Sequence, residues 1–317
     1  MSEVSDRFLV TGGAGFIGSH LVRRLVADGG RVRVVDNLAT GKRERLADLE
    51  GSIEFVEGDL ADPDICENAL DGVDYVLHQA AVPSVQRSVK NPIETNRANV
   101  TSTLNLLERC RKHGVRRFVN ASSSSAYGDT PVLPKREDMP PNPLSPYALQ
   151  KFVGERYCQL YFRLYGLETV SLRYFNVFGP NQDPSSEYSA VIPKFATRLG
   201  KGEPIVVYGD GEQSRDFTYI DNVVEANILA LSAPGAAGAV INVGCGERIT
   251  LNRLIAILEE IMGVRAAVDH QPARPGDVRD SLADISLARD LLGYEPKVGV
   301  TEGLRRTAAW FTANAPR

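Results

Sequence analysis

Tyr147 and Lys151 are a pair of residues whose types and spacing suit proton transfer. Residues four positions apart share one face of a helix. An ammonium group beside a phenol favours the phenolate, so this pairing is expected to lower the pKa of Tyr147 and make it a base. The same spacing also occurs in helices that do no chemistry, with a buried tyrosine beside a solvated lysine. The pair therefore indicates catalysis only if the chain supplies a reaction partner; a serine run at 122–125 lies a little upstream.

A glycine-rich turn between an expected strand and an expected helix supplies that partner. The apolar run 8–11 leads into the sequence GGAGFIG at 12–18, and the next expected strand, 31–35, ends in Asp36. This order is required at a dinucleotide site, because glycines let the backbone approach a pyrophosphate at a helix N-terminus. Asp36 would bind the ribose hydroxyls and favours NAD, although a basic pair at 42–43 leaves NADP open.

Strand-like and helix-like stretches alternate through the first half of the chain. Further strands are expected at 53–57, 74–78, 117–120 and 168–173, and long helices at 92–113 and 147–165. This alternation predicts an α/β fold with a Rossmann-like, doubly wound parallel sheet. Ligands bind beyond the carboxyl ends of such strands. The residues that follow strand ends are therefore expected to meet at one edge: the glycine turn, Asp36, Asp59, Ala80, Ala81 and the serine run.

The strict alternation lapses after residue 182, where prolines become denser. We expect residues 1–175 to form an NAD-binding domain, with parts of 220–245 returning to its sheet. Residues 176–317 are expected to form mostly a smaller C-terminal lobe that binds substrate over the strand ends. Within it, 251–262 has apolar residues at helical spacing and predicts a core-facing helix.

Composition excludes several classes of function. The chain has 317 residues, 43% of them hydrophobic, a net charge of −4 and a pI near 5.7, which argues against an extended nucleic-acid surface. Its four cysteines are scattered, and no histidine is spaced for a zinc site, so we expect reduced thiols, no metal and a cytoplasmic protein. No apolar run has signal-peptide or membrane-spanning length, so no membrane partner is expected.

With these motifs, the chain resembles the extended short-chain dehydrogenase/reductase family over nearly its whole length, and within it the NAD-dependent UDP-hexose 4-epimerases. The resemblance implies that Tyr147 and Lys151 are the catalytic pair. It adds a serine four residues before the tyrosine of Tyr127-Gly128, which is Ser123, with Ser124 as the alternative within the serine run. The cofactor-binding residues that it implies are Gly12, Gly15, Phe16, Ile17, Gly18, Asp36, Asn37, Asp59, Leu60, Gln79, Ala80, Ala81, Asn99, Tyr147 and Lys151.

Three later segments resemble the nucleotide-sugar-binding elements of this family, at 173–180, 208–221 and 274–277. Arginines from two separate loops suit a diphosphate, because each guanidinium can bind two oxygens at once. Surface salt bridges are the competing interpretation of these arginines. The substrate-binding residues implied by the resemblance are Asn176, Val191, Tyr208, Arg215, Arg274, Asp277 and Ser281.

The resemblance also separates possible reactions. Sugar 4,6-dehydratases place Asp-Glu directly after the catalytic Ser or Thr, and UDP-glucuronate decarboxylases carry Glu two residues before the tyrosine of the Tyr-Gly step. This chain has Ser124 and Ser125 there, and hydroxyls do no acid–base work near neutral pH. Epimerisation is therefore favoured over elimination or decarboxylation, and a sugar-nucleotide dehydratase or reductase of the same family stays an alternative. A non-catalytic NAD-binding regulator stays an alternative, although it would usually lack the Ser/Tyr/Lys set that is present here.

The resemblance gives less specific expectations for the sugar substrate and for the oligomeric state. Ser281 stands at the rim of the sugar pocket by resemblance, and a small residue there leaves room for a C2 N-acetyl group. This favours UDP-GlcNAc and UDP-GalNAc, perhaps alongside UDP-Glc and UDP-Gal. UDP-glucuronate stays open because Arg87 or Arg279 could meet a C6 carboxylate. One departure from the family pattern is Pro83, which replaces a lysine found near the cofactor in some glucose-specific members and leaves that contact open. The two long helices are expected to pair with a second copy in a homodimer.

Overall fold

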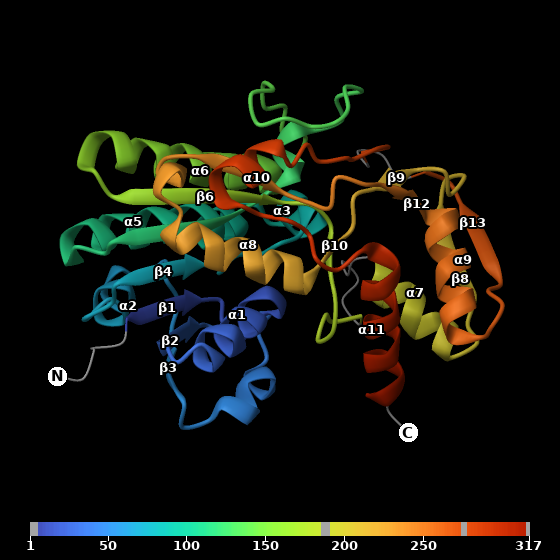
Figure 1. The fold of residues 1–317 in the computed structure, drawn as a ribbon, viewed down its shortest axis with the longest axis horizontal. Coiled ribbons are helices and arrows are strands. Elements are labelled where there is room, and N and C mark those ends of the chain that lie inside the picture. Colours follow the sequence, from blue (N-terminus) through green and yellow to red (C-terminus); the bar gives the residue numbers. More distant parts are fainter. Residues whose placement is uncertain (1–5, 185–190, 274–277, 315–317) are drawn as a thin grey trace.

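Seven parallel strands form the central sheet of this computed structural model, which describes residues 6–184, 191–273 and 278–314 (Figure 1). Their spatial order is β11-β6-β5-β4-β1-β2-β3, which reverses direction between β1 and β4. Ligands of open parallel sheets bind at such a reversal. The strands are β1 (Arg7–Thr11), β2 (Arg31–Asp36), β3 (Ile53–Glu57), β4 (Tyr75–His78), β5 (Arg117–Ser123), β6 (Glu168–Tyr174) and β11 (Val240–Val243). The predicted fold class is confirmed.

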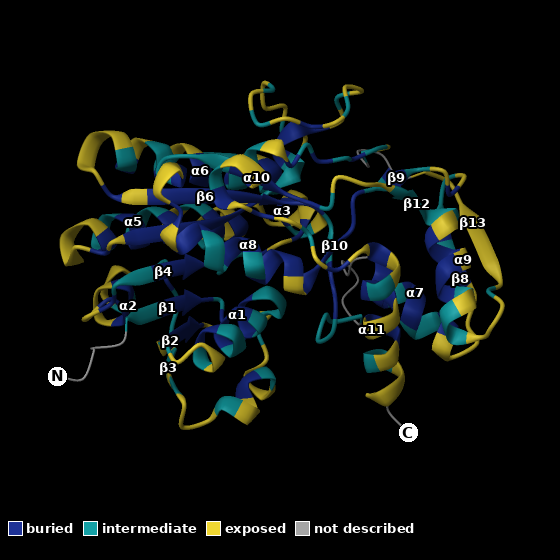
Figure 2. Ribbon diagram, viewed as in Figure 1, coloured by how far each residue is buried: buried dark blue, intermediate teal, exposed yellow. Residues whose placement is uncertain are grey.

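Helices cover both faces of this sheet because successive strand residues point to opposite sides. Val10 of β1 packs in one apolar cluster with α1 (Phe16–Ala27) and α8 (Ile220–Ser232). Its neighbour Leu9 packs in a second cluster, with α2 (Pro63–Ala69), α5 (Ser102–His113) and α6 (Pro146–Tyr165). Figure 2 shows the strands buried between these two helical layers.

The helix expected at 92–113 is interrupted. It consists of α4 (Pro92–Asn96), one π-helical turn (Arg97–Thr101) and α5. Apolar periodicity does not reveal a π-helical turn, which inserts a single residue into an otherwise regular helix. Asn99 lies in this turn, where its side chain accepts a hydrogen bond from the Val82 backbone N–H at 2.7 Å. The short helix α3 (Val85–Lys90) precedes α4.

The smaller lobe contains α7 (Val191–Gly200), α9 (Leu251–Met262) and α11 (Val300–Ala313), which pack together. Beside them, β8 (Ile205–Tyr208) pairs in parallel with the exposed strand β13 (Val268–Gln271). Two further short pairs are β7 (Val177–Phe178) with β10 (Thr218–Tyr219) and β9 (Ser214–Arg215) with β12 (Ile249–Thr250). Helix α10 (Ser286–Leu292) packs beside β11 of the central sheet.

Candidate active site

The catalytic candidates lie where the end of β5 meets the start of α6. Ser145 caps α6 by accepting the Ala148 N–H, and Pro146 occupies the first turn, so the helix begins just before Tyr147. The Tyr147 N–H donates to the Ser88 hydroxyl at 3.0 Å, which ties this end to α3. Ser123, the last residue of β5, hydrogen-bonds the Tyr147 phenol. The structure thus brings the two predicted residues together.

The choice between the two candidate serines follows from these contacts. The Ser123 hydroxyl accepts the Ser125 N–H at 3.2 Å, which leaves its own proton for the Tyr147 oxygen. Ser124 instead begins the 3-10 turn Ser124–Tyr127. Ser123 is therefore the serine that contacts Tyr147.

The pKa of Tyr147 is shifted in the direction opposite to the one expected from the sequence. Burial raises the pKa of Tyr147, and the hydrogen bond from Ser123 only partly opposes it. Burial also lowers the pKa of Lys151 to about 8, with the Glu155 carboxylate opposing. The Lys151 Nζ donates to the Ala121 carbonyl at 2.8 Å. In the protein alone, desolvation thus outweighs any lowering of the Tyr147 pKa by its neighbour.

The glycine loop forms a tight crossing between β1, α1 and the end of β4. Gly12 has a φ of +65°, and a Cβ there would lie 2.7 Å from the Ala80 nitrogen. A Cβ on Gly18 would lie 2.1 Å from the Gly12 carbonyl oxygen. Gly15 precedes α1 and no side chain caps that helix, so its first N–H groups are available to an anion. This loop therefore fits the pyrophosphate of a dinucleotide.

Asp36 lies beside this loop. Its carboxylate accepts the Ala14 N–H at 3.0 Å and the Leu38 N–H at 2.8 Å. Burial raises its pKa, and the two backbone hydrogen bonds oppose that shift. Each carboxylate oxygen keeps lone-pair capacity for a ribose hydroxyl. The acid thus fits the dinucleotide role that its position after β2 predicts.

The other cofactor-binding candidates occupy the same carboxyl edge. The Asp59 carboxylate forms an ion pair with Arg97 and accepts the Ala61 N–H, and Leu60 is buried beside it. The Asn99 amide bridges the Val82 carbonyl and Gln150. Of the remaining candidates, Phe16 and Ile17 begin α1, Asn37 follows β2, and Gln79, Ala80 and Ala81 follow β4.

On the substrate side, Asn176 and Ser281 are in contact. The Asn176 amide donates to the Ser281 hydroxyl at 3.2 Å and to the Asp216 carbonyl at 3.0 Å. Asn176 has a φ of +26°, a region that L side chains rarely adopt. Ser281 is only 8% exposed. Two residues singled out separately from the sequence are thus hydrogen-bonded to each other in the fold.

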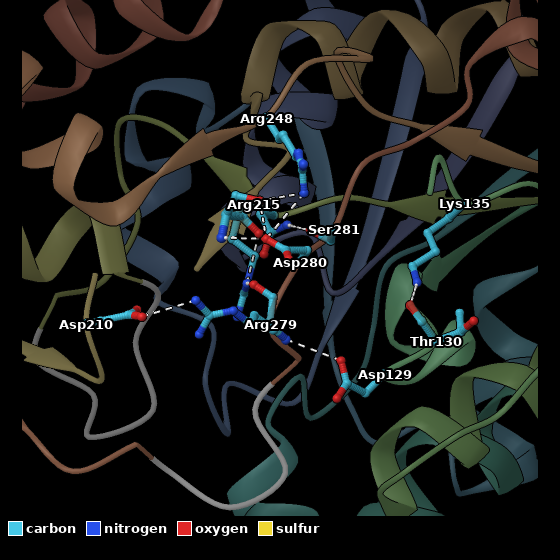
Figure 3. Close-up of polar contacts among 11 residues, drawn as sticks. Asp129, Thr130, Lys135, Asp210, Arg215, Arg248, Arg279, Asp280 and Ser281 are labelled. Carbon is cyan, nitrogen blue, oxygen red and sulfur yellow. Dashed lines mark hydrogen bonds and ion pairs between the residues drawn. The ribbon is translucent and has the colours of Figure 1, made fainter. Parts of the chain in front are cut away.

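Three arginines gather around the extended segment that carries Ser281 (Figure 3). The Arg215 guanidinium donates to the Ser214 carbonyl at 2.9 Å and to the Arg279 carbonyl at 2.7 Å. Arg279 pairs with Asp210 at 3.1 Å, and Arg248 pairs with Asp280 at 3.3 Å. Tyr208 ends β8 and Val191 begins α7. Arg274 and Asp277 lie outside the described residues.

Other chemistry finds no support in the described ranges. No group of histidine, cysteine and acidic residues there could hold a metal ion. Within 6–184, 191–273 and 278–314, no helix is both long and apolar enough to cross a membrane. His78 packs between the Thr11 and Thr103 hydroxyls, and burial lowers its pKa to about 3.

Comparison with known proteins decides the family. A model of the NAD dependent epimerase/dehydratase family matches residues 8–244. The chain belongs to this family. A UDP-glucose 4-epimerase from Mycolicibacterium smegmatis is 40% identical over 309 residues, which cover 96% of this chain and 98% of that protein. The predicted NAD-dependent enzyme, and its resemblance to UDP-hexose 4-epimerases, are confirmed.

Two further members of the family are similar over nearly their full length. The structure of a UDP-N-acetylglucosamine 4-epimerase from Methanobrevibacter ruminantium, in complex with UDP-N-acetylmuramic acid, has a TM-score of 0.93 and 42% identity; the match covers 98% of this chain and 99% of that one. A UDP-glucuronate 4-epimerase from Thermodesulfobacterium geofontis is 38% identical over 319 residues, 97% of this chain and 96% of that protein.

Several residues that support the site in this epimerase-family chain escaped sequence reasoning. The Asp216 carboxylate accepts the N–H groups of Cys245, Gly246 and Ala283. Because the Asp216 carbonyl also accepts the Asn176 amide, this residue links Asn176 to the segment that follows β11. Burial raises the pKa of Asp216 to about 6. The Gln79 amide donates to Tyr174 and Asn227. Asp216 lies beside Arg215 in a mostly polar segment and Asn227 in a mostly apolar one, and neither position reveals its partners.

Proposed function

We propose that this chain reversibly epimerises C4 of a UDP-hexose, with UDP-GlcNAc and UDP-GalNAc as its main substrates and UDP-Glc and UDP-Gal as further ones. The observation that carries the reaction type is the Ser123–Tyr147 hydrogen bond one helical turn from Lys151, at the same carboxyl edge of the sheet as the glycine loop. NAD bound at that loop would accept the C4 hydride and later return it to the opposite face of the sugar.

Each member of the set has a separate task in this proposal. Tyr147 takes the proton of the 4-hydroxyl, which lets the C4 hydride leave. Ser123 donates to the Tyr147 oxygen and so favours its deprotonated form. Lys151 holds the nicotinamide ribose, and its ammonium adds positive charge near the phenol. Cofactor binding is assigned to the loop residues named above. The two arginine-bearing segments, 208–221 and 274–277, hold the diphosphate while the sugar turns over.

The absence of acids after Ser123 supports epimerisation over elimination. Ser124 and Ser125 occupy the positions at which dehydratases carry carboxylic acids. The Ser125 N–H donates to Ser123 and its side chain is a hydroxyl, so it offers no acid for removing water. The 4-keto sugar would then have only hydride return open to it.

The contact between Asn176 and Ser281 supports the N-acetylated substrates. The small Ser281 side chain is held by the Asn176 amide at 3.2 Å, so it is fixed at the wall instead of filling the pocket. An aromatic residue at this position would crowd a C2 N-acetyl group. The tethering roles of Tyr208, Arg215, Arg274 and Asp277 and the contact from Val191 are part of the same proposal.

UDP-glucuronate is a second candidate substrate, and Arg87 favours it. This arginine lies on α3, the helix whose Ser88 holds the backbone of Tyr147. Its guanidinium makes no hydrogen bond or ion pair with the other described side chains. Arg279, the other arginine considered for a C6 carboxylate, is already paired with Asp210.

We also propose that the chain forms a homodimer in the cytoplasm. Large apolar side chains are exposed on α4 and α6, among them Ile93 at 87% and Leu149 at 50%. Burying such a face in a second copy removes apolar surface from water. The free thiols of Cys66, Cys110, Cys158 and Cys245 are compatible with a reducing compartment.

A direct assay tests the reaction. Purified protein is incubated with UDP-GlcNAc, UDP-Glc or UDP-glucuronate in separate reactions, and the sugars are separated and quantified over time. We expect UDP-GalNAc to accumulate to an equilibrium ratio without added NAD. Stoichiometric NADH release with every hexose unchanged would contradict the proposal. Faster turnover of UDP-glucuronate than of UDP-GlcNAc would select the second candidate.

A further inference from the structure

Three consecutive residues of β5 each hold one residue of α6. The Ala121 carbonyl accepts the Lys151 Nζ at 2.8 Å, and the Ser123 hydroxyl donates to the Tyr147 phenol. Between them, the Ser122 hydroxyl donates to the Glu155 carboxylate. Because Tyr147, Lys151 and Glu155 follow one another at four-residue spacing, these contacts lock one side of α6 onto the end of β5.

Glu155 is the member of this set that the proposed reaction does not use. Its side chain is 1% exposed and that of Arg173 is 5% exposed. The Arg173 guanidinium donates to the two carboxylate oxygens at 2.8 and 2.7 Å. Arg173 lies on β6 directly opposite Ser122, and its guanidinium lies 4.6 Å from the Tyr127 ring centre. A buried bidentate pair of this kind has high geometric specificity.

Charge beside Lys151 comes from Glu155. The Glu155 carboxylate opposes the lowering of the Lys151 pKa by burial. Around the pair, burial lowers the pKa of His78 and raises the pKa of Cys158 and Tyr127 to about 12, so these groups are neutral at pH 7. Glu137, in the loop after the 3-10 turn, acts on Arg173 and Tyr127. The anion that acts on Lys151 is thus the one that Arg173 and Ser122 hold in place.

We propose that Glu155 is a positioning residue, which supplies the negative charge next to Lys151 and, through Ser122, fixes the end of β5 on which Ser123 stands. The inference rests on the proposed roles of Tyr147 and Lys151. It assigns the buried Glu155–Arg173 pair a task in the reaction as well as in the fold. Buried ion pairs add little net stability over apolar side chains of similar volume, so a role beyond stability gives a reason for this one.

The charge is tested with Glu155→Gln. The titration of Lys151 is followed by NMR on protein with isotope-labelled lysines, and the signal is assigned with Lys151→Arg. We expect the midpoint for Lys151 to fall by about one pH unit or more, because a neighbouring negative charge is lost. In parallel, kcat should fall and its alkaline limb should move to lower pH, while KM for the UDP-sugar stays within about twofold. An unchanged Lys151 midpoint would overturn the proposal.

A second variant separates this role from a purely structural one. Glu155→Gln leaves the Arg173 charge buried without its partner, which by itself can destabilise the protein. The double variant Glu155→Met/Arg173→Met replaces the pair with apolar side chains and should recover thermal stability. We expect its Lys151 midpoint and pH–rate profile to stay shifted. Recovery of both to wild-type values would mean that the pair only stabilises the fold. Because the NMR titration needs no turnover, it remains decisive even if no UDP-sugar is epimerised.

Discussion

The side chains of Asn176 and Ser281 are hydrogen-bonded at 3.2 Å although they lie 105 residues apart in the sequence. The contact joins the segment after β6 to the segment that carries Asp280, which forms an isolated β-bridge with Ser214. A change of size at Ser281 is therefore expected to act directly on the wall of the proposed sugar pocket. Ser281 is buried and is held on one side by the Asn176 amide, so a larger side chain there would have little free space around it.

Enlarging this position should change substrate preference. Ser281→Tyr is expected to lower kcat/KM for UDP-GlcNAc by about tenfold or more relative to UDP-Glc, since a single steric misfit in a pocket costs about 1–3 kcal/mol. Ser281→Ala is the matched control, because it removes the hydroxyl without adding bulk and should affect both sugars alike. The two substrates are assayed side by side. Equal losses for both in the tyrosine variant would contradict the steric explanation.

Removing the phenol oxygen should stop the reaction but not cofactor binding. Tyr147→Phe is expected to lower turnover by about 10²–10⁴-fold, the usual contribution of a general base. NAD content, measured after denaturing the purified protein, should match the wild type. Tyr165→Phe, at the exposed far end of α6, is the control and should keep full activity. Near-normal turnover by the Tyr147 variant would exclude this residue as the base.

The charge on Lys151 should set an alkaline limit to activity. Burial lowers its pKa to about 8, so the ammonium is present below that pH and is lost above it. We expect kcat to fall as the pH rises through about 8. Lys151→Arg keeps its charge throughout this range and should remove that fall, even if its absolute rate is lower. A pH–rate profile on both proteins checks this; an identical alkaline limb in the variant would assign the limit to another group.

Adding one methyl group to the glycine loop should release the cofactor. Gly12→Ala would put a Cβ 2.7 Å from the Ala80 nitrogen at a φ of +65°. Gly29→Ala is a matched control, since it has a φ of +83° but no atom within 4 Å of the added methyl. Both should lose about 1–2 kcal/mol of unfolding free energy to backbone strain. Only the Gly12 variant should also lose NAD, as read from the nucleotide released on denaturation; loss of NAD by both would point to global destabilisation.

A charge on the apolar face of α4 and α6 should separate the proposed dimer. Leu149→Asp is expected to shift the mass measured by light scattering from that of two chains to that of one, because a buried unpaired carboxylate is costly. Val132→Asp, at a similarly exposed site in a loop, is the control and should leave the mass unchanged. A wild-type mass of one chain would refute the dimer.

The sequence predicts those parts of the site that depend on local spacing. The glycine turn and Asp36 lie within one strand–helix–strand unit, and Tyr147 and Lys151 lie within one helix. Glu155 and Asp216 escaped because their partners lie on other elements, and the place of an acid in the sequence does not reveal which N–H or guanidinium it meets. The raised pKa of Tyr147 was missed for a related reason: desolvation depends on all the packed neighbours, not on one residue four positions away.

Asp36 links cofactor preference to the shape of the loop. The carboxylate that would exclude a 2′-phosphate also holds the backbone N–H groups of Ala14 and Leu38. A substitution that admits NADP by removing this acid would therefore also release the turn that cradles the pyrophosphate. Engineering towards NADP would therefore need an uncharged residue at position 36 that still accepts these N–H groups, together with use of the basic pair at 42–43 for the added phosphate.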